Sequence, residues 1–263
     1  MATHIDPHSI VSPRAELGEN VCVGPFAVVE DNVIIGDGTS IGAHAVVASG
    51  ARIGKECKIH SGAVIGTVPQ DLKFHGEETT LEIGDRTVVR EFATLNRGTE
   101  DRWKTIIGSN CLLMAYVHVA HDCILGERVI LANAVNMGGH VTIEEYVIVG
   151  GMTPIHQFVT IGRHVMVGGG FRVPKDVPPY VLAAQEPLSF GGLNIVGLKR
   201  RNFSRQAIDS LEKAYGFLYH SNLNVSQAVV KIKNEVPMTP EVQHVIEFVE
   251  NSKRGIIGAR RRD

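Results

Sequence analysis

The sequence predicts a mainly β fold, a parallel β-helix of hexapeptide repeats over residues 1–190 followed by an α-helical domain over residues 191–263. Two observations predict the β-helix: an aliphatic residue recurs every six positions, and glycine often follows it. A third predicts the change of class, because the repeat stops after Val173 and apolar residues then recur at helical spacing.

The six-residue repeat runs from Ile5 to Val173. Of its 29 positions, 26 carry an aliphatic residue or Met, and Gly follows in 13 of those 26 repeats. Each unit is expected to form one short strand and a corner, and three units to form a triangular coil whose aliphatic residues point inward. Residues 18 apart in the sequence are therefore expected to be vertical neighbours on adjoining coils.

Three positions break the repeat with carboxylates, namely Asp71, Glu77 and Asp101. An unpaired carboxylate inside the prism would cost several kcal/mol, so the chain is expected to leave the coil near residues 67–81 and 98–105. The interruptions are multiples of six, so the register is expected to resume after each. Loops on a rigid repeat are common places for binding residues.

The four cysteines show no C-x-x-C spacing, so neither a zinc ribbon nor a disulfide framework is expected. Reduced, buried thiols are the interpretation for all four, and Cys57, Cys111 and Cys123 fall on a small interior position two residues before an aliphatic one. No apolar run approaches the roughly 20 residues of a membrane span. With no signal peptide evident, a cytoplasmic protein without an integral membrane segment is expected.

Three helices are expected after a proline-rich exit from the prism. Ser204 caps the first, the second spans about 225–235, and the third starts at Thr239 with Pro240 at its first position. The apolar faces of the first and third comprise Ile208, Leu211, Tyr215 and Leu218, and Val242, Val245, Ile246 and Val249.

Charge is unevenly distributed although the net charge is only −2. Residues 1–190 carry 14 Lys and Arg against 21 Asp and Glu, whereas residues 191–263 carry 12 against 7. The basic C-terminal part predicts an acidic partner.

Four histidines fall on adjoining coils, namely His118, His121, His140 and His156. By the 18-residue rule, His121 lies beneath Gly139 and then Gln157, while His118 lies beneath Asn136. One interpretation is that these imidazoles are simply solvated. Another is a metal site, since the γ-class carbonic anhydrases bind zinc with interfacial histidines on a hexapeptide β-helix. The matching earlier positions here are Glu82 and Asp85, which disfavours metal.

A general base fits the histidine pattern better. Neutral imidazole near pH 7 can take a proton from a hydroxyl, which is worth about 10²–10⁴ in rate. The N–H of Gly139, one strand spacing from His121, is placed to face a developing oxyanion. Asp122 is a candidate to orient His121, although neighbours along a strand usually point to opposite faces. No metal and no cofactor are expected.

Several motifs carry a resemblance to a known family. They are "QDLKF" from Gln70 to Phe74, "HVAHD", "GGH" from Gly138 to His140, "GGMTPIHQF", "HVMVGG", "DVPPYV" and "GLNIVGLKRR". Over essentially the whole chain they resemble the UDP-N-acetylglucosamine O-acyltransferase family that begins lipid A synthesis. The resemblance implies a left-handed coil and transfer of an (R)-3-hydroxyacyl group from acyl carrier protein to the sugar 3-hydroxyl of UDP-N-acetylglucosamine. It also implies a homotrimer with active sites between subunits; a nucleic-acid partner is not expected.

The resemblance also implies roles for individual residues. His121 is the general base, Gly139 the oxyanion donor, and His118 and His140 contact substrate. The other implied substrate-binding positions are Gln70, Asp71 and Lys73 in the first loop, His156 and Gln157 on the nucleotide side, Asn194, Arg200 and Arg201 for the uridine diphosphate, and Gly169 at the floor of the acyl groove. The guanidinium fork of arginine matches phosphate oxygens, and glycine at position 169 predicts a relatively long acyl group.

The chain departs from the family pattern at three places. Val196 replaces a frequent acidic residue, a histidine often found near Pro187 is missing, and Asn96 stands where some members have His. The first two departures make the nucleotide contacts less well determined than the catalytic histidine. The acceptor stays open between N-acetylglucosamine and a 3-amino analogue. A lone prism is expected to offer flat faces and no deep cleft, which favours a site shared between chains.

Rival functions differ in the features that they require. The later N-acyltransferase of the same pathway has a uridine-binding domain before its β-helix, whereas this repeat starts at Ile5. Acetyl-CoA-dependent hexapeptide transferases are a further alternative, but the 67–81 loop and the basic helical tail favour a carrier protein as the acyl donor. A non-catalytic scaffold and a metal-dependent hydratase complete the alternatives.

Overall fold

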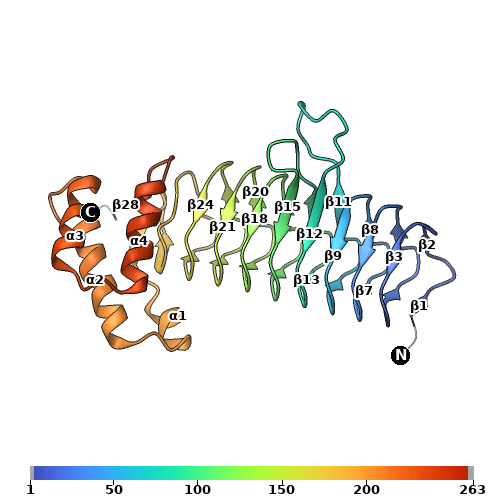
Figure 1. Ribbon diagram of the computed structural model, residues 1–263, viewed down its shortest axis with the longest axis horizontal. Helices are drawn as coiled ribbons and strands as arrows, with labels where there is room; N and C mark the ends of the chain where they lie inside the picture. Colours follow the sequence, from blue (N-terminus) through green and yellow to red (C-terminus); the bar gives the residue numbers. More distant parts are fainter. Residues whose placement is uncertain (1–2, 260–263) are drawn as a thin grey trace.

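The computed structural model describes residues 3–259 of the chain. Figure 1 shows a long prism of stacked coils with the N-terminus at one end and the described helices gathered at the other. This arrangement confirms the predicted fold class, a left-handed parallel β-helix followed by α-helices. No helix within residues 3–259 is long and apolar enough to cross a membrane.

Three sheets form the sides of the prism and are named A, B and C. Sheet A comprises β1 (His4–Ile5), β4 (Cys22–Val23), β7 (Ser40–Ile41), β10 (Lys58–Ile59), β13 (Val88–Val89), β16 (Leu112–Leu113), β19 (Ile130–Leu131), β22 (Ile148–Val149), β25 (Met166–Val167), β26 (Val181–Ala184), β27 (Ser189–Leu193) and β28 (Gly258–Ala259). Sheet B comprises β2 (Ile10–Val11), β5 (Val28–Val29), β8 (Val46–Val47), β11 (Val64–Thr67), β14 (Thr94–Asn96), β17 (His118–Val119), β20 (Asn136–Met137) and β23 (Pro154–Ile155). Sheet C comprises β3 (Glu16–Leu17), β6 (Ile34–Ile35), β9 (Ala51–Ile53), β12 (Thr80–Ile83), β15 (Lys104–Ile107), β18 (Ile124–Leu125), β21 (Thr142–Ile143) and β24 (Thr160–Ile161). The corners between neighbouring sheets are called the A/B, B/C and C/A edges.

The repeat positions form the core of the prism, as predicted. From Val23 to Val173 every aliphatic residue or Met of the six-residue series is at most 3% exposed. Ile5 is 45% exposed because no coil packs beneath the first one. Cys57, Cys111 and Cys123 are buried and unpaired, as expected. The expectation of burial is wrong for Cys22, which precedes Val23 by one residue and so points outward from β4.

Both predicted loops are present, and both are slightly shorter than expected. They span residues 68–79 between β11 and β12 and residues 97–103 between β14 and β15, so Leu81 and Thr105 belong to strands. Ile65 pairs with Leu95 and Leu95 with Val119, which confirms that the register resumes after each loop. Each loop joins a strand of sheet B to one of sheet C, so both leave the prism at the B/C edge, from the same side in Figure 1.

The three predicted helices are confirmed, and a fourth was not predicted. They are α2 (Arg205–Tyr219), α3 (Val225–Glu235) and α4 (Pro240–Asn251), with side-chain caps from Ser204, Asn224 and Thr239. The apolar faces predicted for α2 and α4 are buried. The additional helix α1 (Ile195–Arg200) is a short turn capped by Asn194.

The prism continues beyond Val173, where the sequence pattern ends. A bridge joins Ile155 to Val173, and Met166 of β25 pairs with Leu182 of β26. β27 then pairs antiparallel with β26 and runs across residue 190. After α4 the chain returns, and β28 pairs with β27. Sheet A therefore includes strands on both sides of the helices in the sequence.

Candidate active site

The histidine and the aspartate predicted as base and helper meet at the B/C edge. Nδ1 of His121 lies 2.8 Å from Oδ2 of Asp122. These neighbours can meet because Asp122 stands at a coil corner with a φ of 59°, in the left-handed region, and not within a strand. The Asp122 side chain is fully buried, whereas 13% of the His121 side chain is exposed. Only the imidazole of the pair therefore reaches the surface.

Further hydrogen bonds hold the Asp122 carboxylate. Thr99 donates its N–H to Oδ1 at 3.0 Å and its hydroxyl to Oδ2 at 2.6 Å. Burial alone would raise the pKa of Asp122, but the hydrogen bonds from His121 and Thr99 lower it to about 2. The ionised carboxylate only accepts, so Nδ1 of His121 carries the proton between them. In the neutral ring Nε2 is then free to act as a base.

Gly139 covers the imidazole of His121 from the next coil. A methyl group added at Gly139 would lie 2.6 Å from Cε1 and 2.7 Å from Nε2 of His121, so a side chain here would displace the imidazole. The Gly139 N–H donates no hydrogen bond to any residue within 3–259. Corner amides elsewhere in the prism, such as that of Ala43, are free in the same way. What distinguishes Gly139 is the imidazole directly against it.

His118 and His140 flank this pair, as predicted. The His140 ring lies edge-on to that of His121, with 5.1 Å between centroids, and stacks on Phe158 at 4.5 Å. Nδ1 of His118 lies 2.7 Å from the hydroxyl of Thr94. Burial lowers the pKa of both His118 and His140. Both rings therefore favour the neutral form and are suited to hydrogen-bond a substrate.

His121, Asp122 and His140 also bring three possible metal ligands within 4.8 Å of one another. However, both Asp122 oxygens already accept hydrogen bonds, from Thr99 and from Nδ1 of His121. A metal would have to displace these donors. The set is thus better suited to proton transfer than to holding a cation.

The long loop places its candidate residues at the same B/C edge. Gln70 and Lys73 are exposed, and Asp71 accepts from the backbone N–H of Lys73 at 3.0 Å. The base of the loop is fixed by Asn96, whose amide donates to the Thr67 hydroxyl at 3.0 Å and to the Val68 carbonyl at 3.1 Å. Polar side chains thus stand on an anchored loop at the same edge, two coils from the coil of His118 and His121.

His156 and Gln157 lie on the next coil of the B/C edge, and both are exposed. Nδ1 of His156 lies 3.1 Å from the Gln157 carbonyl oxygen. No hydrogen bond, ion pair or ring contact within residues 3–259 joins His156 to the other three histidines. Of the four histidines, His121 and His140 are the pair whose rings are in contact within residues 3–259. His118 lies on the coil of His121, and His156 lies on the coil after that of His140.

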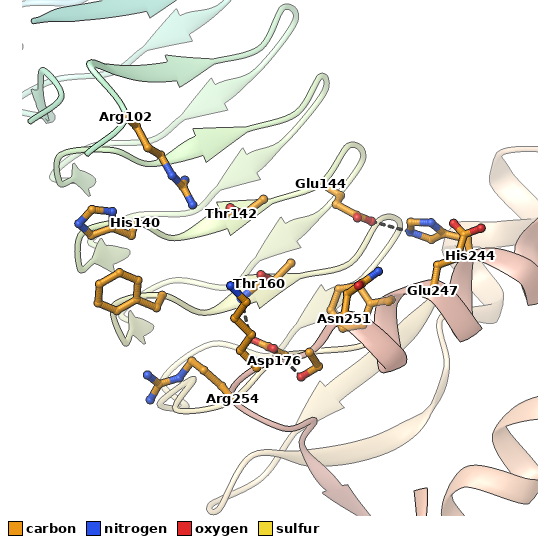
Figure 2. A pocket seen from close by; sticks show the side chains of 14 residues that line it. Arg102, His140, Thr142, Glu144, Thr160, Asp176, His244, Glu247, Asn251 and Arg254 are labelled. Carbon is orange, nitrogen blue, oxygen red and sulfur yellow. Dashed lines mark hydrogen bonds and ion pairs between the residues drawn. The ribbon is translucent and has the colours of Figure 1, made fainter. Parts of the chain in front are cut away.

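A groove of about 640 Å³ runs across the outer face of sheet C beside His140. Thr142 and Thr160 of sheet C and residues of α4 line it, and in Figure 2 the hydrogen-bonded side chains of Glu144 and His244 lie at one end. Nε2 of His244 lies 2.8 Å from the Glu144 carboxylate. The groove exists because α4 and the segment after it rise from the sheet, whereas the expectation of flat faces concerned the coils of the prism alone.

Asn194 and Arg201 lie near the C/A edge, one sheet away from His121. Asn194 caps α1 and donates to the His164 carbonyl at 2.9 Å. The Arg201 guanidinium lies 4.9 Å from the centre of the Tyr146 ring. Burial, with help from neighbouring arginines, lowers the pKa of His164 to about 4. Arg200 is exposed at the end of α1. Within one chain these residues and His121 thus stand on different edges.

Gly169 occupies the third edge, A/B, where it is exposed and follows β25. A methyl group added at Gly169 would lie 3.0 Å from the Gly151 carbonyl oxygen, on the coil below. The expected separation of Gly169 from His121 is thereby confirmed for one chain.

Sequence reasoning missed Thr99, Arg102 and Phe158. Arg102 donates to the Asp122 carbonyl at 2.7 Å, and Phe158 stacks on His140. Phe158 was detectable, because it lies 18 residues after His140. Thr99 and Arg102 were not, because the path of the 97–103 loop does not follow from the repeat.

Comparisons with known proteins agree along the chain. A family model described as Udp N-acetylglucosamine O-acyltransferase, domain 2, matches residues 176–257. A second model, of bacterial transferase hexapeptide repeats, matches residues 32–67 and 104–139.

Curated relatives and solved structures cover nearly the whole chain. The chain is 45% identical to the acyl-[acyl-carrier-protein]–UDP-N-acetylglucosamine O-acyltransferase of Thiobacillus denitrificans, over 98% of this chain and 100% of that protein. It is 55% identical to the protein of the same name from Sulfurihydrogenibium sp., over 96% and 93%. It also resembles the solved structure of a UDP-N-acetylglucosamine acyltransferase from Bacteroides fragilis, with a TM-score of 0.95, 46% identity and coverage of 96% and 99%.

Proposed function

The chain belongs to the acyl-[acyl-carrier-protein]–UDP-N-acetylglucosamine O-acyltransferases, and from that premise we propose that His121 is the general base of an acyl transfer to UDP-N-acetylglucosamine. The donor is an (R)-3-hydroxyacyl group on acyl carrier protein, the acceptor is the sugar 3-hydroxyl, and the reaction begins lipid A synthesis. One observation carries the proposal: the His121 imidazole lies between the ionised Asp122 and the backbone of Gly139.

The arrangement supports a definite sequence of proton movements. Nε2 of His121 takes the proton of the sugar hydroxyl as its oxygen attacks the thioester carbonyl carbon. The Gly139 N–H stabilises the resulting oxyanion, which is worth about 3 kcal/mol for a preorganised donor. When the carbon–sulfur bond breaks, the imidazolium returns the proton to the leaving thiolate. Asp122 stabilises the imidazolium in between and stays ionised.

The test combines product analysis with a matched pair of variants. Purified enzyme is given UDP-N-acetylglucosamine or its 3-amino analogue together with 3-hydroxyacyl carrier proteins of graded length, and products are identified by mass spectrometry. We expect His121→Ala to lower kcat by at least about 10² with the fold intact. The control is His60→Ala, because His60 also pairs with a carboxylate, Glu91 at 3.3 Å, but lies at the A/B edge. Near-normal turnover by His121→Ala would remove the assignment.

We infer further that the complete site needs a trimer. The outer face of sheet A carries a ladder of partly exposed apolar side chains, namely Leu112, Ile130, Ile148, Met166 and Leu182. The outward positions of sheet B include the polar Thr94, His118 and Asn136. Apolar ladders of this kind are typical of subunit contacts. Such a contact would bring Gly169 of one chain toward His121 of another.

The assembly can be tested by placing a charge in the ladder. Ile130→Arg is expected to shift the sedimentation coefficient from trimer to monomer and to abolish transfer together, because the inserted guanidinium would be buried without a partner. The control is Val230→Arg, since Val230 is an exposed residue of α3 remote from sheet A's ladder. A monomer that retains full activity would contradict the shared site.

A further inference from the structure

Thr99 makes two hydrogen bonds to the carboxylate that orients His121. It lies in the 97–103 loop and is only 7% exposed. Its N–H reaches Oδ1 of Asp122 at 3.0 Å, and its hydroxyl reaches Oδ2 at 2.6 Å. Oδ2 is also the atom that accepts from Nδ1 of His121, at 2.8 Å. The hydroxyl and the imidazole therefore share one carboxylate oxygen.

The loop that carries Thr99 is itself held at several points. The Gly98 N–H donates to the Thr80 carbonyl at 3.1 Å, and the Thr79 hydroxyl donates to the Gly98 carbonyl at 2.6 Å. The Trp103 N–H donates to the Thr99 carbonyl at 2.7 Å. A methyl group at Gly98 would lie 2.3 Å from the Lys104 nitrogen, so no side chain fits there. The donors of Thr99 are thus presented from a fixed backbone.

We propose that Thr99 is a positioning residue for the acyl transfer, acting through Asp122 on the orientation and tautomer of His121. A buried carboxylate can rotate about its Cβ–Cγ bond unless hydrogen-bond donors hold both of its oxygens. The two Thr99 donors, one to each oxygen, fix that plane and so fix where Nδ1 of His121 is held. The inference rests on the proposed role of His121 as base.

The experiment separates this role from simple stabilisation. Thr99→Val removes the hydroxyl and keeps shape and backbone donor, whereas Thr99→Ser keeps the hydroxyl. Loss of a hydrogen bond to a charged group predicts a fall in kcat of about ten- to a hundredfold for Thr99→Val, with little change in KM. Thr99→Ser should stay within about threefold of wild type. Should Thr99→Val not fold, Thr99→Ala makes the same removal with less bulk.

Two further measurements decide the result. Thr87→Val is the control, because Thr87 is a fully buried prism threonine whose hydroxyl donates to the Gly108 carbonyl, away from His121. It should lower the melting temperature without lowering kcat. In an Asp122→Asn background, Thr99→Val should cost less than about threefold, because its route to His121 is already broken.

The outcomes distinguish the inference from the function on which it rests. Absence of transfer by the wild-type enzyme would overturn the proposed function. Normal transfer by wild type together with unaltered kcat for Thr99→Val, or with an equal loss in the Asp122→Asn background, would overturn only the role of Thr99.

Discussion

Adding one methyl group at Gly139 should disable the enzyme without removing any catalytic group. The new carbon would lie 2.6 Å from Cε1 and 2.7 Å from Nε2 of His121. Carbon contacts are normally about 3.5 Å or longer, so the imidazole must retreat by about 1 Å. Gly139→Ala keeps the backbone N–H, so any loss reports the position of His121.

The magnitude follows from the displacement. A misplacement of about 1 Å costs about 10²-fold in rate, and we expect kcat/KM for Gly139→Ala to fall by that factor. The assay is the initial rate of acyl transfer at saturating acyl carrier protein, with circular dichroism as a check on folding. Gly216→Ala in α2 is the matched control, because nothing lies within 4 Å of a methyl group there.

A second variant makes the reasoning refutable. In a His121→Ala background the methyl group at position 139 has room, so Gly139→Ala should cost little more. If Gly139→Ala alone keeps kcat/KM within about threefold of wild type, the imidazole is not held against Gly139 during the reaction. If the two losses simply multiply, the methyl group acts on something other than His121.

Three other predictions use different features. The pKa of Asp122 lies below its unfolded value, so the ionised carboxylate stabilises the fold by about 2 kcal/mol above pH 4, and this contribution is lost as pH falls through about 2. Urea unfolding should show that the difference in unfolding free energy between wild type and Asp122→Asn narrows over that range. A difference that stays constant with pH would contradict the prediction. Residues 191–263 carry 12 Lys and Arg against 7 Asp and Glu, and this excess should attract an acidic carrier protein, so KM for acyl carrier protein should rise markedly with salt. A KM that does not change with salt would contradict electrostatic attraction of the donor. Gly169→Met should shift preference to shorter acyl groups by more than tenfold, since each methylene is worth about 0.8 kcal/mol; coinciding length profiles would place the floor elsewhere.

The prism and the helices were predictable because their causes are local. A buried aliphatic residue every six positions identifies the inward side of each strand, and the 18-residue rule correctly places His121 beneath Gly139. Ser204, Thr239 and Pro240 mark helix starts through their own side chains. In each case the residues that signal the element also form it.

The remaining features depend on contacts that the repeat does not encode. Strand alternation argued against a contact of His121 with Asp122, and the left-handed corner at Asp122 permits it. The bond from Thr99 depends on the path of a loop outside the repeat. Likewise, the groove beside sheet C exists only because α4 packs next to that sheet. The amphipathic pattern of α4 predicts which face is buried but not the surface against which it packs.

Because β28 returns to sheet A, the helical part is an insertion within that sheet and not a C-terminal extension. The chain departs through β27 and re-enters at its immediate neighbour, where Ser189 pairs with Gly258 and Phe190 with Ala259. Gly258 is therefore one strand spacing, about 4.8 Å, from Ser189 at the start of β27, whereas the chain departs four residues further on, at Leu193. Topologically the helices are an insertion between adjacent strands, not a dangling extension. A module attached at both ends to the same edge of one sheet can be exchanged for another of different length or shape while its support stays unaltered. Variation between relatives in this region can thus be absorbed without disturbing the coils that hold His121.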